Sequence, residues 1–408
     1  MIIAVTTLGL AQITAWGTSF YCLGVLAKPI AADTGWTLSL IYLGFTVAVL
    51  MMGAVSTWAG RATDRYGAQR VMAVGVVLVS VALALLAISR SEGWYLGVWA
   101  LLGIGMRLCL YDTAFAGLVQ VVPSRGRLAI SYLTLFGAFA STIFWVLGHQ
   151  LEQAYGWRWT LAAFAAINLV VCLPLNWIGL SRREAPGVAD NGAAATEKTR
   201  AASIDGPPLT GQPRRIAIGL LALVMALNGL VFGVVTVQLV PLLEAAQLST
   251  TAAVWIASTK GFGQFAGRVV EIVFGRHLRA ITVARLAIGA LPWSFVVLLL
   301  GAGHFHALLL FTLLMGASQG VITIVRGALP LALFGSAGYG AVLGLLATPV
   351  LIVNAGAPTL FALIVDGWGW EVAEVVLLVA AAASWLTMEG MARWYQRQRA
   401  VVVAQPGH

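Results

Sequence analysis

Two basic side chains lie within long apolar segments of this 408-residue chain. Arg107 falls near the middle of the segment 94–121, and Lys260 falls near the middle of the segment 252–274. A charged side chain at membrane depth is costly, so each is a candidate functional residue. A guanidinium can hold a carboxylate through two parallel hydrogen bonds, and a lone ammonium there needs an anion or a carbonyl partner. The two residues therefore indicate a binding site for an anion.

Both residues also have a structural interpretation. Arg107 could pair with Asp112, although five residues along one helix is a poor spacing for direct contact. Lys260 would be interfacial if its helix began later in the sequence. Three uncharged polar residues are further candidates for substrate binding: Tyr21, Tyr111 and Asn228.

No acidic residue falls at the centre of the segments that would surround such a site. A cationic substrate, or a cycle driven by protons or sodium, usually needs an intramembrane acid. An anionic substrate brings its own charge. Anion exchange, facilitated passage and proton symport through a substrate carboxylate therefore all remain open.

The composition is that of a polytopic membrane protein. Hydrophobic residues make up 60% of the chain and charged residues only 10%, with a mean hydropathy of +0.91. Soluble domains contain about 25% charged residues. Twelve apolar segments are long enough to cross a bilayer. They lie near 4–27, 38–59, 71–89, 94–121, 128–150, 160–180, 216–241, 252–274, 281–302, 306–331, 339–365 and 372–391.

The segments divide into two groups of six. We expect an N-terminal bundle over 1–180, a polar linker over 181–215, a C-terminal bundle over 216–392 and a tail over 393–408. Placing both termini in the cytoplasm puts seventeen of the 24 Lys and Arg residues on that side and three outside. This asymmetry follows the positive-inside rule and accounts for the net charge of +9 without a nucleic-acid partner.

One short pattern occurs twice in the chain. Gly60, Arg61 and Asp64 close the second segment, and Gly267, Arg268 and Glu271 close the eighth, 207 residues later (267 − 60). Glycine, arginine and acid at equal spacing suggest two related halves, as in carriers built from repeats.

The first copy extends to Arg70 and resembles motif A of the major facilitator superfamily, Gly-x-x-x-Asp-Arg-x-Gly followed by basic residues. Ala68 and Gln69 occupy positions that are often basic in that family. The resemblance implies an all-α fold of twelve transmembrane helices in two six-helix bundles, with alternating access to a central site. It also implies a cytoplasmic gate. Its residues would be Gly60, Asp64, Arg65, Gly67, Arg70 and Asp112, with Arg268 and Glu271 as a weaker second copy.

Shorter resemblances indicate the substrate class. Gly17–Tyr21, Leu110–Phe115 and Thr323–Gly327 are similar to a bacterial branch near the monocarboxylate carriers. The fifth segment lacks the Gly-Pro pair of drug/proton antiporters. The resemblance therefore implies a secondary transporter for a small organic anion, in the inner membrane and acting as a monomer.

Two alternatives remain open. Cys22 and Cys109 could act as soft ligands in a metalloid carrier of the arsenite type, or the chain could export other small molecules. The second alternative is a membrane sensor that transports no substrate. Neither a catalytic constellation nor the ligand spacing of a metal site occurs in the sequence, so we expect no enzyme activity, no cofactor and no bound metal.

Overall fold

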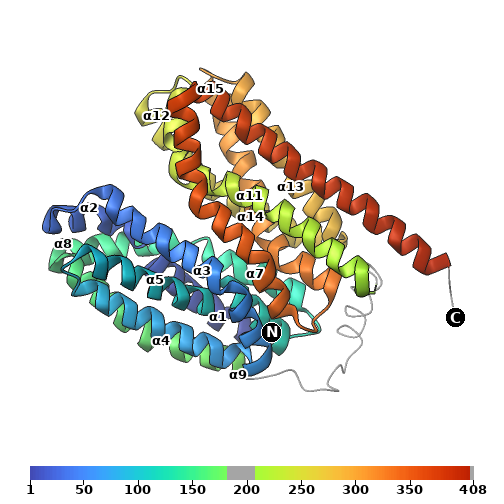
Figure 1. Cartoon of the computed structure of the whole chain (residues 1–408), viewed down its shortest axis with the longest axis horizontal. Helices are drawn as coiled ribbons and strands as arrows, with labels where there is room; N and C mark the ends of the chain where they lie inside the picture. Colours follow the sequence, from blue (N-terminus) through green and yellow to red (C-terminus); the bar gives the residue numbers. More distant parts are fainter. Residues whose placement is uncertain (182–206, 405–408) are drawn as a thin grey trace. The chain divides into compact units, whose positions relative to one another are not determined.

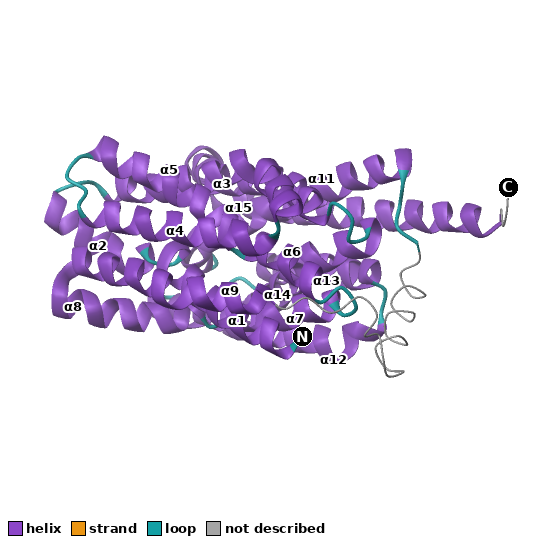
Figure 2. Cartoon of the chain, turned by 90° about the horizontal axis from the view of Figure 1, so that it is seen from below, coloured by secondary structure: helices purple, strands orange, loops and turns teal. Residues whose placement is uncertain are grey.

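Helices form every regular element in the part of the chain that the computed structural model describes, residues 1–181 and 207–404. Figure 2 shows helices joined by short loops. The predicted all-helical fold class is therefore confirmed. The chain divides into two compact units, Met1–Arg200 with Ser336–Thr348, and Ala201–Gly335 with Pro349–His408. The segment Ser336–Thr348 groups with the first unit, although the predicted boundaries assign it to the second bundle.

The helices follow one another along the chain in the order of the colours in Figure 1, from blue to red. The first unit contains α1 (Ile2–Ala15), a π-helical turn (Trp16–Phe20), α2 (Leu23–Thr34), α3 (Leu38–Tyr66), α4 (Ala68–Ala87), α5 (Glu92–Cys109), α6 (Tyr111–Val121), α7 (Gly126–Gly137), α8 (Ala140–Ile167), a second π-helical turn (Asn168–Cys172) and α9 (Leu173–Ser181). The second contains α11 (Gly211–Ala245), α12 (Thr250–Phe274), a 3₁₀ turn (Gly275–His277), α13 (Ala280–Leu300), α14 (Phe305–Phe334) and most of α15 (Tyr339–Ala404).

Nine helical stretches within the described residues are long and apolar enough to cross a membrane. Two of them, 126–181 and 339–399, are of double length and contain a glycine with positive φ. These glycines, Gly156 (φ 77°) and Gly369 (φ 83°), fall between predicted segments, so the chain turns where the sequence places the loops. The chain is therefore a multi-pass membrane protein.

α12 is not among the nine stretches, although its 25 residues give it a length of about 37 Å. It is less apolar because it carries Lys260, Arg268 and Glu271. Its start is defined by Ser249, whose hydroxyl accepts a hydrogen bond from Ala252 N at 3.4 Å. Such N-caps satisfy an amide that has no partner within the helix.

Several predicted single helices are interrupted in the structure. The segment 4–27 contains the π-helical turn Trp16–Phe20, the segment 160–180 contains the turn Asn168–Cys172, and the segment 94–121 breaks at Leu110. The predicted linker 181–215 also ends early, because α11 begins at Gly211. Residues 182–206 lie outside the described part. α15 continues through most of the predicted tail, to Ala404, and residues 405–408 lie outside the described part.

Close helix packing in both units depends on small residues. A Cβ atom at Gly103 of α5 would collide with the Ala48 carbonyl oxygen of α3. A Cβ atom at Gly267 of α12 would collide with the Ala317 carbonyl oxygen of α14. In lipid, helices associate through close van der Waals packing rather than through hydrophobic burial, so small residues at these crossings bring the backbones together.

Candidate functional site

The break at Leu110 organises the charged centre of the first unit. Leu110 adopts extended backbone angles (φ −84°, ψ −167°), so α5 ends at Cys109 and α6 starts at Tyr111. A broken helix leaves carbonyl groups that need other partners, and irregular backbone at membrane depth persists only where it is buried in protein. The Thr113 hydroxyl donates to Arg107 O at 3.1 Å, and Gln12 Nε2 donates to Cys109 O at 2.8 Å.

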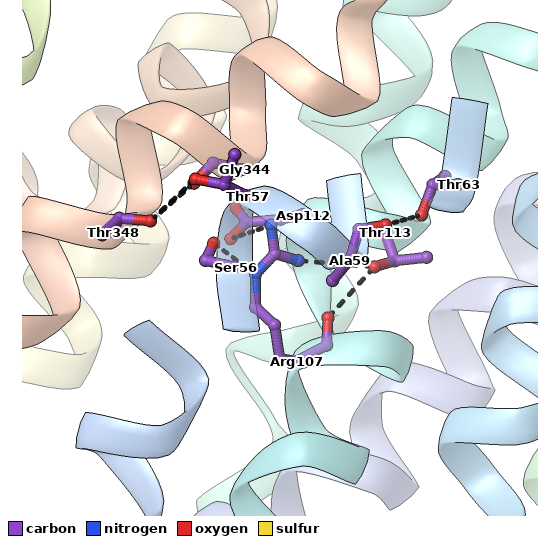
Figure 3. Close-up of polar contacts among 9 residues, drawn as sticks. All are labelled: Ser56, Thr57, Ala59, Thr63, Arg107, Asp112, Thr113, Gly344 and Thr348. Carbon is purple, nitrogen blue, oxygen red and sulfur yellow. Dashed lines mark hydrogen bonds and ion pairs between the residues drawn. The ribbon is translucent and has the colours of Figure 1, made fainter. Parts of the chain in front are cut away.

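Arg107 and Asp112 meet across this break (Figure 3). Arg107 Nη2 lies 3.7 Å from Asp112 Oδ2, and both side chains are buried. Arg107 Nε donates to Ser56 Oγ at 2.6 Å, and Nη1 lies 3.4 Å from Thr113 Oγ1. The expectation that five-residue spacing disfavours contact was therefore wrong, because it assumed a continuous helix.

This environment changes the interpretation of Arg107. Its charge is opposed by a carboxylate of the same unit, and its donors are directed at Ser56 and Thr113. An exposed guanidinium waiting for a substrate would instead keep free donors. The geometry favours a role in holding the junction of α5 and α6, and binding of substrate by Arg107 stays a prediction.

Aromatic side chains gather around the π-helical turn. The Trp16 ring lies 5.0 Å from Tyr111, 6.1 Å from Tyr21 and 4.9 Å from Phe20, measured between ring centroids. Trp145 of α8 lies 6.4 Å from Tyr21 and donates from Nε1 to Tyr21 O at 3.1 Å. The structure thus brings the predicted residues Tyr21 and Tyr111 together through Trp16. We call these five residues the aromatic cluster.

The motif A acid acts as a helix cap within the first unit. Asp64 Oδ1 accepts from Gly340 N at 2.9 Å, and Oδ2 accepts from Ala341 N at 2.7 Å. Both amides belong to the first turn of α15, where a carboxylate is favoured by unpaired N–H groups and by the helix dipole. Gly60 permits this contact, because a Cβ atom there would collide with the Gly340 carbonyl oxygen.

The predicted charge cluster around motif A takes a different form. Asp64 bonds to backbone amides rather than to Arg65 or Arg70. Arg65 lies over the Tyr66 ring at 5.2 Å, and Asp112 pairs with Arg107. Gly67 separates α3 from α4 at φ 85°, as its place in the motif suggests.

The second copy of the pattern has a different environment. Arg268 and Glu271 are both buried, whereas Asp64 and Arg61 are exposed. Gly267 packs against α14, as described above. The repeated sequence pattern therefore lies in two unlike surroundings.

Lys260 is half-buried in the second unit, with its ammonium 5.5 Å from the centroid of the Phe232 ring of α11. Within the described residues, no hydrogen bond or ion pair joins this ammonium to another side chain. Asn228 is buried and donates to Ser384 Oγ at 2.6 Å and to Val224 O at 2.8 Å. Asn228 therefore links α11 to α15, and its predicted contact with substrate stays a prediction.

A strong ion pair in the second unit was missed from the sequence. Arg285 of α13 donates from Nε and Nη2 to the two carboxylate oxygens of Glu389 of α15, both at 2.7 Å. The available signal was an acid, Glu389, near the end of the last predicted span.

The three cysteines are buried and free. The Cys22 thiol donates to Ser19 O at 3.0 Å, and the Cys172 thiol donates to Ala11 O at 3.4 Å. Among the described residues, no group of three or more His, Cys, Asp or Glu side chains could hold a metal ion.

Comparisons with known proteins give the family and the fold. Multidrug resistance protein MdtL of Escherichia coli O6:K15:H31 (strain 536 / UPEC) is 27% identical over 178 residues, 43% of this chain and 44% of that protein. MdtL of Escherichia fergusonii is 27% identical over 176 residues, with the same coverage. The matches thus span less than half the length of these relatives.

Two solved structures share the fold over nearly the whole chain. The human organic anion transporter MFSD10 (TETRAN) has a TM-score of 0.71 at 17% identity, covering 95% of this chain and 99% of that one. The proton:xylose symporter XylE has a TM-score of 0.71 at 13% identity, covering 95% of each chain. The sequence model of the Major Facilitator Superfamily matches residues 8–299, more than half of the chain. This protein therefore belongs to the Major Facilitator Superfamily.

Proposed function

We propose that this protein is a secondary transporter that carries a small organic anion, such as a monocarboxylate, by alternating access. The observation that carries the proposal is the Lys260 ammonium, which lies over the Phe232 ring and has no hydrogen bond or ion pair to a side chain among the described residues. An ammonium at membrane depth without an acidic partner is costly, and a bound anion would compensate its charge. A carboxylate substrate supplies that anion.

The aromatic cluster supports a substrate that also has an apolar part. Trp16, Tyr21 and Tyr111 are partly exposed and come from two different spans. Aromatic rings with a polar edge offer apolar contact together with hydrogen-bonding groups. We therefore propose a substrate that carries an apolar part in addition to its carboxylate.

Arg107 and motif A belong to the gate in this proposal. The pair Arg107–Asp112 and the Asp64 cap both hold helix ends inside the first unit. A contact that must form and break is a suitable element for a two-state cycle. We place both termini in the cytoplasm of a cell with an inner membrane, and we propose a monomer that uses exchange or proton symport.

Export of apolar small molecules is the second candidate. The MdtL relatives are multidrug resistance proteins by name, and the aromatic cluster suits such compounds. Metalloid export through Cys22 and Cys109 is a third, and it requires the Cys22 thiol to exchange its Ser19 carbonyl partner for the metalloid.

A ligand screen separates these candidates. Purified protein would be heated with carboxylates, inorganic anions, arsenite or lipophilic cations, and the hits would then be tested for uptake into proteoliposomes. We expect carboxylates to stabilise the protein and to be transported. Stabilisation by lipophilic cations alone would favour export of drugs. Loss of arsenite transport on replacing both cysteines with Ser would favour the metalloid carrier.

A further inference from the structure

An apolar groove of about 830 Å³ lies between α4 and the end of the span formed by the second π-helical turn and α9. It lies entirely within the first unit. Its walls include Ala73, Val74, Val77 and Leu78 of α4, together with Leu173 and Trp177 of α9. Pro174 of α9 is also part of the wall. Ala73 and Pro174 have short side chains, which leave room between the helices. The groove plays no part in the transport site proposed above.

Arg70 lies on the same face of α4 as the groove. The four α4 residues in the wall follow Arg70 by three, four, seven and eight positions, which is the repeat of one helix face. From Arg70 to Leu78 the helix rises about 12 Å, close to the thickness of one leaflet of a 30 Å hydrocarbon core. One face of α4 thus carries the cation Arg70 near its N-terminal end and lines the apolar groove further along.

A hydrogen bond identifies which end of the groove carries the charge. Gln69, next to Arg70, donates from Nε2 to Trp177 O at 3.0 Å. Trp177 lines the groove, is 51% exposed and belongs to the last two turns of α9. Tryptophan at the end of a span is typical of the headgroup level of a bilayer. Arg70 is therefore next to a residue that contacts a tryptophan of the kind typical of this level, where lipid phosphates also lie.

Arg70 has no partner within the described residues. The motif A acid, Asp64, bonds to Gly340 and Ala341, and no hydrogen bond or ion pair joins Arg70 to another described side chain. Its side chain is exposed. The resemblance to motif A implies that Arg70 belongs to the gate. Its position on α4, however, is on the face that lines the groove.

We propose that the groove is a binding site for one anionic phospholipid, with its phosphate at Arg70 and one acyl chain between α4 and α9. A guanidinium pairs with phosphate through two hydrogen bonds, and Trp177, which lines the groove, is bonded to Gln69 beside Arg70. The walls offer the acyl chain almost no polar atoms, as a lipid tail requires. A water-soluble substrate would leave its polar groups without partners along these walls.

Native mass spectrometry of the full chain in detergent tests the site. Wild type and variants would be mixed with phosphatidylglycerol or with phosphatidylcholine, and the lipid-bound fraction measured. Arg70→Gln removes the charge, and Val74→Trp fills the groove from a side chain that is 55% exposed. Arg397→Gln is the matched control, because Arg397 is also exposed but belongs to α15 and is not part of the groove wall.

We expect Arg70→Gln to lower the affinity for phosphatidylglycerol about fivefold, the effect of one basic residue near an anionic headgroup. Val74→Trp should lower it as well, while Arg397→Gln leaves it unchanged and phosphatidylcholine binds more weakly to wild type. Circular dichroism would confirm that Arg70→Gln and Val74→Trp keep the helix content of wild type. Equal binding by Arg70→Gln and wild type, an equal loss in Arg397→Gln, or no effect of Val74→Trp would overturn the proposal.

Discussion

Arg107 and Asp112 form a buried ion pair across the helix break at Leu110, with 3.7 Å between Nη2 and Oδ2. Asp112 lies in the first turn of α6, where the helix dipole also favours its negative charge. Arg107 reaches from α5 to Ser56 of α3. The pair therefore joins α5 to α6, and Arg107 also links α5 to α3.

Removing one partner of this pair should destabilise the protein strongly. We expect Arg107→Ala to lower the free energy of unfolding by about 3–5 kcal/mol, because Asp112 is then left as a buried charge without compensation. The double variant Arg107→Met/Asp112→Leu should recover part of that loss. Unfolding of purified protein in denaturant would measure both. A single variant as stable as wild type would show that the pair contributes nothing.

Asp64 should control the order of the first turn of α15. Asp64→Ala removes both acceptors for Gly340 N and Ala341 N, and loss of a cap costs about 0.5–2 kcal/mol. Hydrogen exchange at these two amides should accelerate. Asp33→Asn is the control, since Asp33 pairs with Arg158 at 3.2 Å elsewhere in the unit. Unchanged exchange in Asp64→Ala would contradict the capping role.

Gly60 should tolerate no side chain. A Cβ atom there collides with the Gly340 carbonyl oxygen, and forcing extra atoms into a packed contact costs about 1–3 kcal/mol. We expect Gly60→Ala to lower thermal stability and transport together. Gly97→Ala on α5 is the matched control, because its added methyl group meets no atom within 4 Å. Equal behaviour of the two variants would argue against close packing at Gly60.

Trp16 should contribute to substrate affinity. Trp16→Ala removes the ring that contacts Tyr21 and Tyr111, and aromatic contacts of this kind are worth about 0.5–1.5 kcal/mol. We therefore expect KM for the transported substrate to rise about threefold to tenfold, with partial recovery in Trp16→Phe. The control is Trp159→Ala, at an exposed tryptophan of α8. If both alanine variants raise KM equally, the aromatic cluster has no special role.

Much of the fold could be predicted from the sequence, because apolar length and basic loops determine where a chain crosses a bilayer. Gly156 and Gly369, the two glycines with positive φ at which long helices turn, both fall in predicted loops. The break at Leu110 was not visible, since no proline or glycine occurs at that position. Its evidence is the set of side chains, Gln12 and Thr113, that satisfy the carbonyl groups.

The site was predicted less well, because side-chain partners on different helices leave no regular spacing in a single sequence. Arg107 met Asp112 only because the helix breaks between them. Arg285 and Glu389 are 104 residues apart, and no periodicity connects them. The sequence predicts Tyr21 and Tyr111 only as separate candidates. The structure shows that Trp16 contacts both rings and so joins them in one cluster.

The most direct test of the proposed function measures uptake of a radiolabelled carboxylate into proteoliposomes. Each preparation contains wild type or one of three variants, Lys260→Gln, Lys260→Arg and Lys28→Gln. Lys28 is an exposed lysine of α2 and serves as the matched control. Hydrogen bonds to charged groups are worth about 1.5–3 kcal/mol, so we predict that Lys260→Gln lowers kcat/KM about tenfold to hundredfold. Lys260→Arg should retain part of the activity, and Lys28→Gln should match wild type. Carboxylate uptake by Lys260→Gln at the wild-type rate would contradict the central role of Lys260.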